Sequence, residues 1–167
     1  MITVGPATLA DASQVLALYR AVAAMPNGGL ARGPDEYDLA HIEALLAKCA
    51  NGGVALLARD KDALVGTIDA MRIGPRQFAH ALSDITVAVH PSAQGRGVGR
   101  ALFAALFDAA AALTPKVTRF ELMVREGNRD AVRLYERLGF RIEGRYEGRV
   151  ALPDGTLEAD IAMGRLL

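Results

Sequence analysis

Apolar residues recur at helical spacing in two segments near the start of the chain. In the first segment, the pattern predicts a helix that ends near residue 24. Thr8 and Asp11 form a predicted capping box at its start. The second segment, over residues 39–49, predicts a helix that Asn51-Gly52-Gly53 ends. Residues 25–34 between them are rich in glycine and proline, which predicts a loop. The apolar positions of the two helices are Val15, Leu18, Tyr19 and Val22, then Leu39, Ile42, Leu46 and Cys49.

Short apolar and β-branched runs predict strands in the remainder of the chain. They cover residues 2–5, 54–58, 64–73, 85–89 and 120–124, and Asp60-Lys61-Asp62 predicts a hairpin turn between the second and third runs. From residue 141 to 150, five charged residues alternate with uncharged ones, which predicts a strand with all five charges on one face. Pro153-Asp154-Gly155 then turns the chain into a last strand over residues 156–163.

Two more helices follow strands. One covers residues 100–113 and ends before Pro115, and the other covers residues 129–138 and ends at Gly139. Because helices and strands interleave, with antiparallel hairpins in the middle and at the end, we expect one α/β domain over residues 1–167. Its central mixed sheet is mostly antiparallel and flanked by helices.

Composition narrows the classes of function. The chain has 167 residues, of which 51% are hydrophobic and 23% charged, so it can bury a core and general disorder is excluded. The 19 basic and 19 acidic residues cancel, so we expect no nucleic-acid partner and no membrane surface. With one cysteine and three histidines without ligand spacing, no metal site is expected. There is no long apolar segment and no signal-peptide pattern, so we expect a cytoplasmic protein.

A glycine-rich segment lies between a predicted strand and a predicted helix. Residues 94–99 read Gln-Gly-Arg-Gly-Val-Gly, and Arg96 and Arg100 lie beside the glycines. Glycine lets backbone approach a phosphate, and helix N-terminal N–H groups point at it. A phosphate or pyrophosphate site is therefore predicted, and a tight turn without a ligand is the alternative. A Walker loop is excluded because no Gly-Lys-Ser/Thr follows, and the dinucleotide fingerprint lacks its last glycine.

The same segment resembles the Q/R-x-x-G-x-G/A signature of the GNAT superfamily of N-acetyltransferases. A second segment, from Asn128 through Ala131, Leu134 and Tyr135 to Leu138-Gly139-Phe140, is similar to that superfamily's N…A…LY…LGF motif. The resemblance implies acetyl-CoA as the acetyl donor, bound in a cleft where the fourth and fifth strands splay apart. It assigns acetyl-CoA binding to Val87, Ala88, Val89, Gln94, Gly95, Arg96, Gly97, Val98, Gly99, Arg100 and Asn128.

Acetyl transfer to an amine also needs a base and an acid, because only about one alkyl amine in a thousand is neutral at pH 7 and the leaving thiolate must be protonated. By its place in the motif, Tyr135 is the candidate acid, with a packed core tyrosine as the alternative. Asp84 is the candidate base, where relatives often place a glutamate, and a solvated or capping carboxylate is its alternative. Glu121 is a second candidate carboxylate.

These observations predict an N-acetyltransferase that acts on a primary amine by direct attack in a ternary complex. The alternative is a non-catalytic acyl-CoA-binding regulatory module of the same fold. The resemblance places acceptor specificity in residues 25–38 and 146–156 and is compatible with a homodimer. Asp35, Glu36 and Asp38 suit either a cationic acceptor or the first turn of a helix. The acceptor, whether small molecule, amino acid, antibiotic or protein N-terminus, stays open.

Overall fold

The computed structural model describes residues 1–26 and 28–167 and contains one seven-stranded sheet. The strand order is β1-β2-β3-β4-β5-β7-β6, and every neighbouring pair is antiparallel except β4 and β5. The predicted mostly antiparallel mixed sheet is thus confirmed. The strands are β1 (Ile2–Pro6), β2 (Val54–Asp60), β3 (Ala63–Arg72), β4 (Ala81–Val89), β5 (Arg119–Arg125), β6 (Arg141–Ala151) and β7 (Leu157–Leu166).

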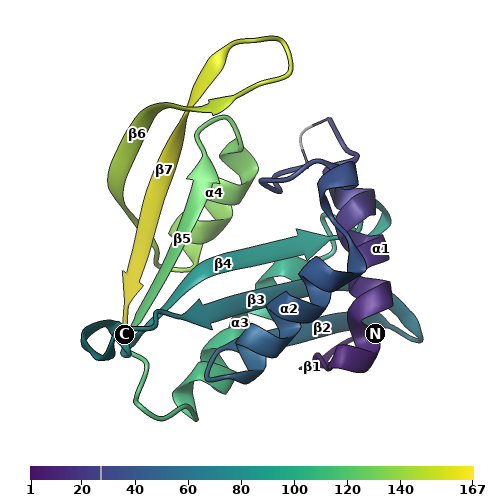
Figure 1. Cartoon of the computed structure of the whole chain (residues 1–167), viewed down its shortest axis with the longest axis vertical. Coiled ribbons are helices and arrows are strands. Elements are labelled where there is room, and N and C mark those ends of the chain that lie inside the picture. Colours follow the sequence, from purple (N-terminus) through teal and green to yellow (C-terminus); the bar gives the residue numbers. More distant parts are fainter. Residues whose placement is uncertain (27) are drawn as a thin grey trace.

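Helices cover both faces of this sheet (Figure 1). α1 (Ala12–Ala23) and α2 (Leu39–Ala50) pack on one face, where their apolar residues form a core with Leu57 and Ala88. α3 (Val98–Ala111) and α4 (Arg129–Arg137) lie on the other face and share the larger core. All four helices were predicted, three of them from apolar spacing and α3 as a long apolar segment. The expected ends lie within two residues of the observed ones, except that α1 begins only at Ala12, after the short 3-10 helix that follows Thr8. The loop predicted over residues 25–34 includes residue 27, which lies outside the described residues.

Helix termini follow their capping residues. The Asp11 carboxylate accepts a hydrogen bond from the Thr8 backbone N–H at 2.9 Å, as the predicted cap box requires, although it caps a short 3-10 helix (Leu9–Asp11) just before α1. The Asp38 side chain accepts the His41 N–H at the start of α2. At the end of α4, Gly139 has φ +88°, the left-handed conformation expected of a glycine that ends a helix.

The charged strand differs from its prediction. Residues 141–151 do form β6, but its register with β7 shifts between Ile142 and Gly144 and again between Tyr146 and Val150. Each shift inserts unpaired residues, so strict two-residue alternation is lost and the five charges do not share one face. Both faces of β6 are largely exposed, and burial therefore imposes no single register.

Two irregularities of β4 create space in the middle of the sheet. β4 pairs with β5 only at Ala81 and Leu82, after which the two strands diverge (Figure 1). On its other side, β4 carries a bulge against β3, where Asp69 pairs with Thr86 but Met71 pairs with Ser83. Within this bulge, Asp84 adopts the left-handed conformation with φ +51°. Among the described residues, none of the helices combines the length and the apolar character needed to cross a membrane.

Candidate functional site

The edge of β4 that faces β5 is open along the segment predicted to bind a cofactor. Val87, Ala88 and Val89 pair with β3 on one side, whereas the described pairing with β5 ends at Leu82. Main-chain N–H and C=O groups on the free edge can therefore bond an extended ligand in the manner of an added strand. The splay that the family resemblance implied is present at this position.

The glycine loop leads from this edge into the N-terminus of α3. Gly95 and Gly97 have φ +73° and +79°, and a Cβ at either would meet nothing within 4 Å. Glycine is required at both positions by the backbone conformation and not by close neighbours. The empty space around them leaves the surface of the loop open to a ligand. Gly97 is the N-cap of α3 and offers no side-chain acceptor, so the first helical N–H groups stay available for an anion.

Two neighbours of this loop face inward. Val98 is 1% exposed, so only its backbone can contribute to a phosphate site. Gly99 lies inside the first turn of α3, and a Cβ there would sit 3.5 Å from Cδ2 of Leu134 on α4. This is an ordinary van der Waals contact, so alanine would also fit at this position.

The polar side chains around the loop have protein partners of their own. The Arg96 guanidinium donates to the Asp60 carboxylate at 2.6 Å, and this hydrogen bond lowers the pKa of Asp60. Gln94 donates from Nε2 to the Val89 carbonyl at 3.3 Å. Asn128 caps α4 by accepting the Ala131 N–H at 3.4 Å. Arg100 is exposed and takes part in none of the ion pairs among the described residues. Unlike Arg96, it can therefore direct its charge to a bound anion.

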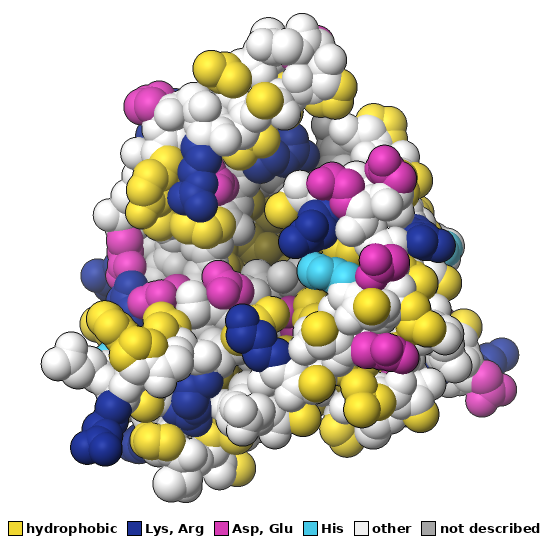
Figure 2. Space-filling view, in the orientation of Figure 1, with side chains coloured by type: hydrophobic (Ala, Val, Ile, Leu, Met, Phe, Trp, Pro, Cys, Tyr) yellow, Lys and Arg dark blue, Asp and Glu magenta, His cyan; other side chains and the backbone are white. Residues whose placement is uncertain are grey.

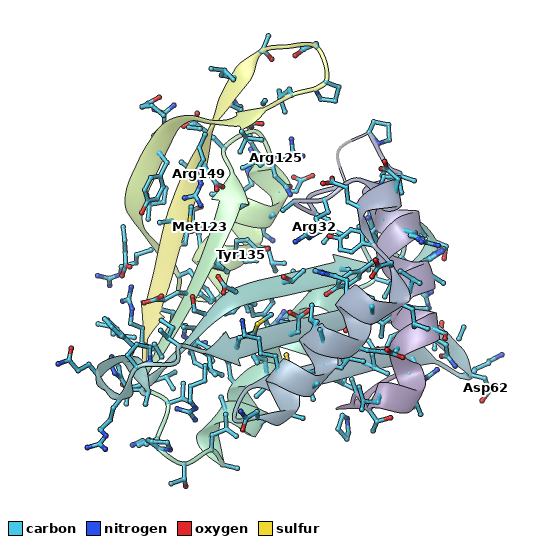
Figure 3. All side chains as sticks on the ribbon, in the orientation of Figure 1. Arg32, Asp62, Met123, Arg125, Tyr135 and Arg149 are labelled. Carbon is cyan, nitrogen blue, oxygen red and sulfur yellow. The ribbon has the colours of Figure 1, made fainter. Side chains whose placement is uncertain are left out.

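Tyr135 lies on α4 beside the region where β5 leaves β4 (Figure 3). Its ring packs edge-on against Phe103, with 5.6 Å between centroids, and at 6.0 Å from the ring of Phe140. Burial raises the pKa of Tyr135 to about 12, so its hydroxyl stays protonated at neutral pH. Among the described residues the hydroxyl has no hydrogen-bond partner, and the side chain combines a core packing role with a free donor.

A cavity of about 530 Å³ opens between the sheet and the two N-terminal helices. Figure 2 shows the hollow near the middle of this face, with basic, acidic and histidine side chains around it. Asp84 and Thr86 of β4 line it from the sheet side. Tyr19 of α1 and Tyr37 contribute aromatic walls, and three basic residues of the α1–α2 loop and α2 complete it, namely Arg32, His41 and Lys48.

The structure separates the two candidate bases. Asp84 is exposed, lines the cavity, and takes part in none of the ion pairs among the described residues. Glu121 instead accepts a hydrogen bond from Arg119 at 2.5 Å, and Arg119 also pairs with Glu143. Glu121 is not among the residues that line the described cavity. Asp84 is therefore the carboxylate placed to meet a small molecule there.

The acidic residues before α2 have capping roles. Glu36 accepts the Gly33 N–H at 2.6 Å, and Asp38 accepts the His41 N–H at 2.7 Å. Neither these two nor Asp35 lines the cavity in the described part of the chain. Of the two interpretations that the sequence left open, the helix-start role is the one that the contacts support.

Sequence reasoning missed a buried pair beneath the cavity. Asp69 of β3 is 1% exposed, and the Tyr19 hydroxyl donates to its Oδ2 at 2.5 Å. Burial raises the pKa of Asp69 to about 7 and that of Tyr19 well above its ordinary value. The available signal was a single carboxylate in the otherwise uncharged run over residues 64–71, but its partner is 50 residues away in the sequence.

Known proteins resemble this chain in both sequence and fold. A stretch of 69 residues is 44% identical to a phosphinothricin N-acetyltransferase of Streptomyces coelicolor. That stretch covers 41% of this chain and 39% of the relative, so the match spans well under half of the relative's length. A GCN5-related N-acetyltransferase from Kribbella flavida superposes with a TM-score of 0.85 at 27% identity, over 99% of this chain and 98% of that one.

A third comparison shows the fold alone. The phosphinothricin acetyltransferase of Sinorhizobium meliloti, a GNAT superfamily protein whose structure was solved in complex with acetyl-CoA, superposes with a TM-score of 0.86 at 21% identity. The superposition covers 99% of this chain and 88% of that one. The model of the acetyltransferase (GNAT) family matches residues 17–140, which is well over half of the chain. With its splayed sheet and glycine loop in place, this chain belongs to the acetyltransferase (GNAT) family.

Proposed function

We propose that this protein transfers the acetyl group of acetyl-CoA to the primary amine of a small acceptor that also carries an anionic group. One observation carries the proposal: β4, whose open edge leads to the glycine loop, also contributes Asp84 and Thr86 to a cavity that three basic residues line from the opposite side. Family membership supports acetyl transfer, and the partial match to a phosphinothricin N-acetyltransferase, 44% identical over 69 residues, supports an acceptor of this class.

The residues present fit acetyl-CoA. The free edge of β4 around Val87–Val89 would hold the pantetheine arm through main-chain hydrogen bonds, and the backbone of residues 94–99 with Arg100 would hold the pyrophosphate at the start of α3. Asn128, whose Oδ1 accepts the Ala131 N–H, would offer its side-chain N–H₂ as a further donor to the cofactor. When bound, acetyl-CoA supplies an activated thioester acetyl group.

Two side chains of this chain hold and move the protons. The acceptor arrives as an ammonium ion, and Asp84 accepts its proton directly or through water, which raises the neutral fraction above about one in a thousand at pH 7. Tyr135 keeps its proton at neutral pH because burial raises its pKa to about 12. Its hydroxyl would therefore supply the proton that the leaving CoA thiolate takes up.

The charges around the cavity support an anionic acceptor. Arg32 and Lys48 are cationic at neutral pH, and His41 lies beside Tyr37 with 5.6 Å between ring centroids. Arg32 lies in the loop between α1 and α2 (Figure 3) and lines the cavity together with Asp84 and Thr86 of β4. An amine with a carboxylate or phosphinate group can place its ammonium at Asp84 and its anion toward Arg32 and Lys48.

A matched panel of amines tests this function by the release of free CoA thiol. The panel contains phosphinothricin, 4-aminobutyrate, n-butylamine and putrescine, so that 4-aminobutyrate and n-butylamine differ chiefly in one carboxylate. We expect kcat/KM about tenfold or more higher for the anionic amine of that pair, and we expect Arg32→Gln to remove most of this preference. Equal values for the pair would contradict the acceptor class. Acetyl-CoA binding without turnover on any amine would favour the regulatory module instead.

We also propose that the chain forms a homodimer and acts in the cytoplasm, where acetyl-CoA is available. Support for the dimer comes from the β6–β7 hairpin, which projects from the rest of the molecule (Figure 1). On it, Tyr146 is 51% and Leu157 67% exposed. Light scattering after size exclusion should give twice the 17.7 kDa of one chain, and Tyr146→Glu should lower that mass.

A further inference from the structure

Asp69 is an unusual residue in this molecule. Among the described residues it is the only ionisable carboxylic acid that is buried, and its Oδ1 is the only fully buried side-chain oxygen or nitrogen without a hydrogen-bond partner. Burying a carboxylate is costly unless a cation or several donors compensate. Its one partner is the Tyr19 hydroxyl on Oδ2.

The groups around Asp69 do not compensate its charge. Tyr19 of α1, Tyr37, Cys49 of α2 and Asp84 of β4 are the titratable groups that face it, and all four are neutral or anionic. None of the ion pairs among the described residues includes Asp69. The charged form of this carboxyl group therefore does not stabilise the fold.

Its position connects Asp69 to the cavity. In the β3–β4 ladder it lies directly opposite Thr86, and directly opposed residues point to the same face of a sheet. Thr86, Tyr19 and Asp84 all line the cavity. Asp69 thus lies just beneath the sheet side of the cavity, attached through Tyr19 to its wall.

We propose that Asp69 is a positioning residue of the acceptor site, a second negative charge under the sheet side of the cavity that draws the acceptor's ammonium group toward Asp84. The inference rests on the proposed function. Arg32, His41 and Lys48 line the opposite side, so the cavity is negative at the sheet and positive at α2. This polarity sets the orientation in which a zwitterionic acceptor binds.

The effect of Asp69 on acceptor binding should depend on pH. Burial raises the pKa of Asp69 to about 7, while the hydrogen bond from Tyr19 opposes that effect. The group is therefore mostly neutral near pH 6 and charged near pH 8.5. Only in its charged form can it attract an ammonium ion.

The experiment compares the acceptor KM of the parent, Asp69→Asn and Tyr19→Phe between about pH 6 and pH 8.5, using the fastest amine of the panel above. For Asp69→Asn, the ratio of its KM to that of the parent should be near one at about pH 6. It should rise to about tenfold at about pH 8.5, with little change in kcat or in the KM for acetyl-CoA. Tyr19→Phe removes the hydrogen bond that favours the charged carboxylate. In this variant, the midpoint of the change in acceptor KM with pH should therefore lie above pH 7.

Asp62→Asn is the matched control, because Asp62 is exposed on the β2–β3 hairpin and points away from the cavity (Figure 3). It should leave every KM unchanged. If the parent acetylates the amine and the Asp69→Asn ratio is the same at all pH values, the inference is wrong and the proposed function stands. If the parent turns over no amine of the panel, the proposed function fails and the inference falls with it. Should Asp69→Asn not fold, an unshifted midpoint in Tyr19→Phe overturns the inference by itself.

Discussion

At the scale of single residues, Tyr135 shows how one side chain can serve packing and chemistry together. Its ring fills a position between Phe103 and Phe140, and removal of the hydroxyl alone leaves those contacts intact. We expect Tyr135→Phe to lower kcat by about 10² to 10⁴-fold. The loss should lie toward the lower end, because burial raises the pKa of Tyr135 to about 12, far above that of a thiol.

The measurement is kcat under conditions in which chemistry limits turnover, with acetyl-CoA affinity and melting temperature as controls. Both controls should change little. A loss of less than about tenfold would show that Tyr135 only packs beside the donor site and is not the general acid.

Asp84 allows an equally conservative change. Its φ of +51° is strained for most residues but tolerated by asparagine, so Asp84→Asn should keep the bulge of β4 while removing the base. We expect the rate to fall most at low pH, where neutral amine is scarcest. A pH–rate profile that superimposes on that of the parent would assign Asp84 a structural role.

At the scale of elements, the N-terminus of α3 separates two glycines that look equivalent in the sequence. Gly97 has φ +79° and open space around it, whereas Gly99 is helical and faces Leu134. Gly97→Val should strain the loop and cover the helical N–H groups, weakening acetyl-CoA binding about 10 to 100-fold. Calorimetry would measure this change.

Gly99→Ala is the control for that experiment. Its Cβ would meet Leu134 at 3.5 Å and Val89 at 4.0 Å, both ordinary contacts, and alanine favours the helix. Acetyl-CoA affinity should therefore persist. Unchanged affinity in Gly97→Val as well would contradict a phosphate site at this loop.

The elements also show what the sequence could predict. Apolar spacing sufficed for α1, α2 and α4, because each of these helices buries one stripe against the sheet. It failed for the pairing of β6, where burial is too weak to impose one register. The glycine loop and Tyr135 could be proposed as site residues because they belong to local motifs. Asp69 and Tyr19 were not, since their contact joins β3 to α1 across 50 residues and only the fold brings them together.

At the scale of the whole molecule, Asp69 couples the cavity to the stability of the fold. A carboxyl group whose pKa is higher in the folded than in the unfolded chain adds stability at low pH, and that contribution is lost as the pH rises through the folded value. For Asp69 the folded value is about 7, against 3.8 in the unfolded chain. The contribution of Asp69 to the free energy of unfolding of the parent should therefore fall between about pH 4 and pH 7 and stay constant above pH 7.

Denaturant unfolding of the parent and Asp69→Asn at several pH values measures this contribution. The unfolding free energy of the parent relative to the variant should fall by up to about 4 kcal/mol across that range. Other carboxylates change stability in the opposite sense: the Thr8 N–H lowers the pKa of Asp11, and Arg119 lowers that of Glu143. Because both proteins retain these groups, their effects cancel in the difference. A difference that does not vary with pH would mean that the Asp69 carboxyl group has the same pKa in the folded and the unfolded chain, which its burial against Tyr19 argues against.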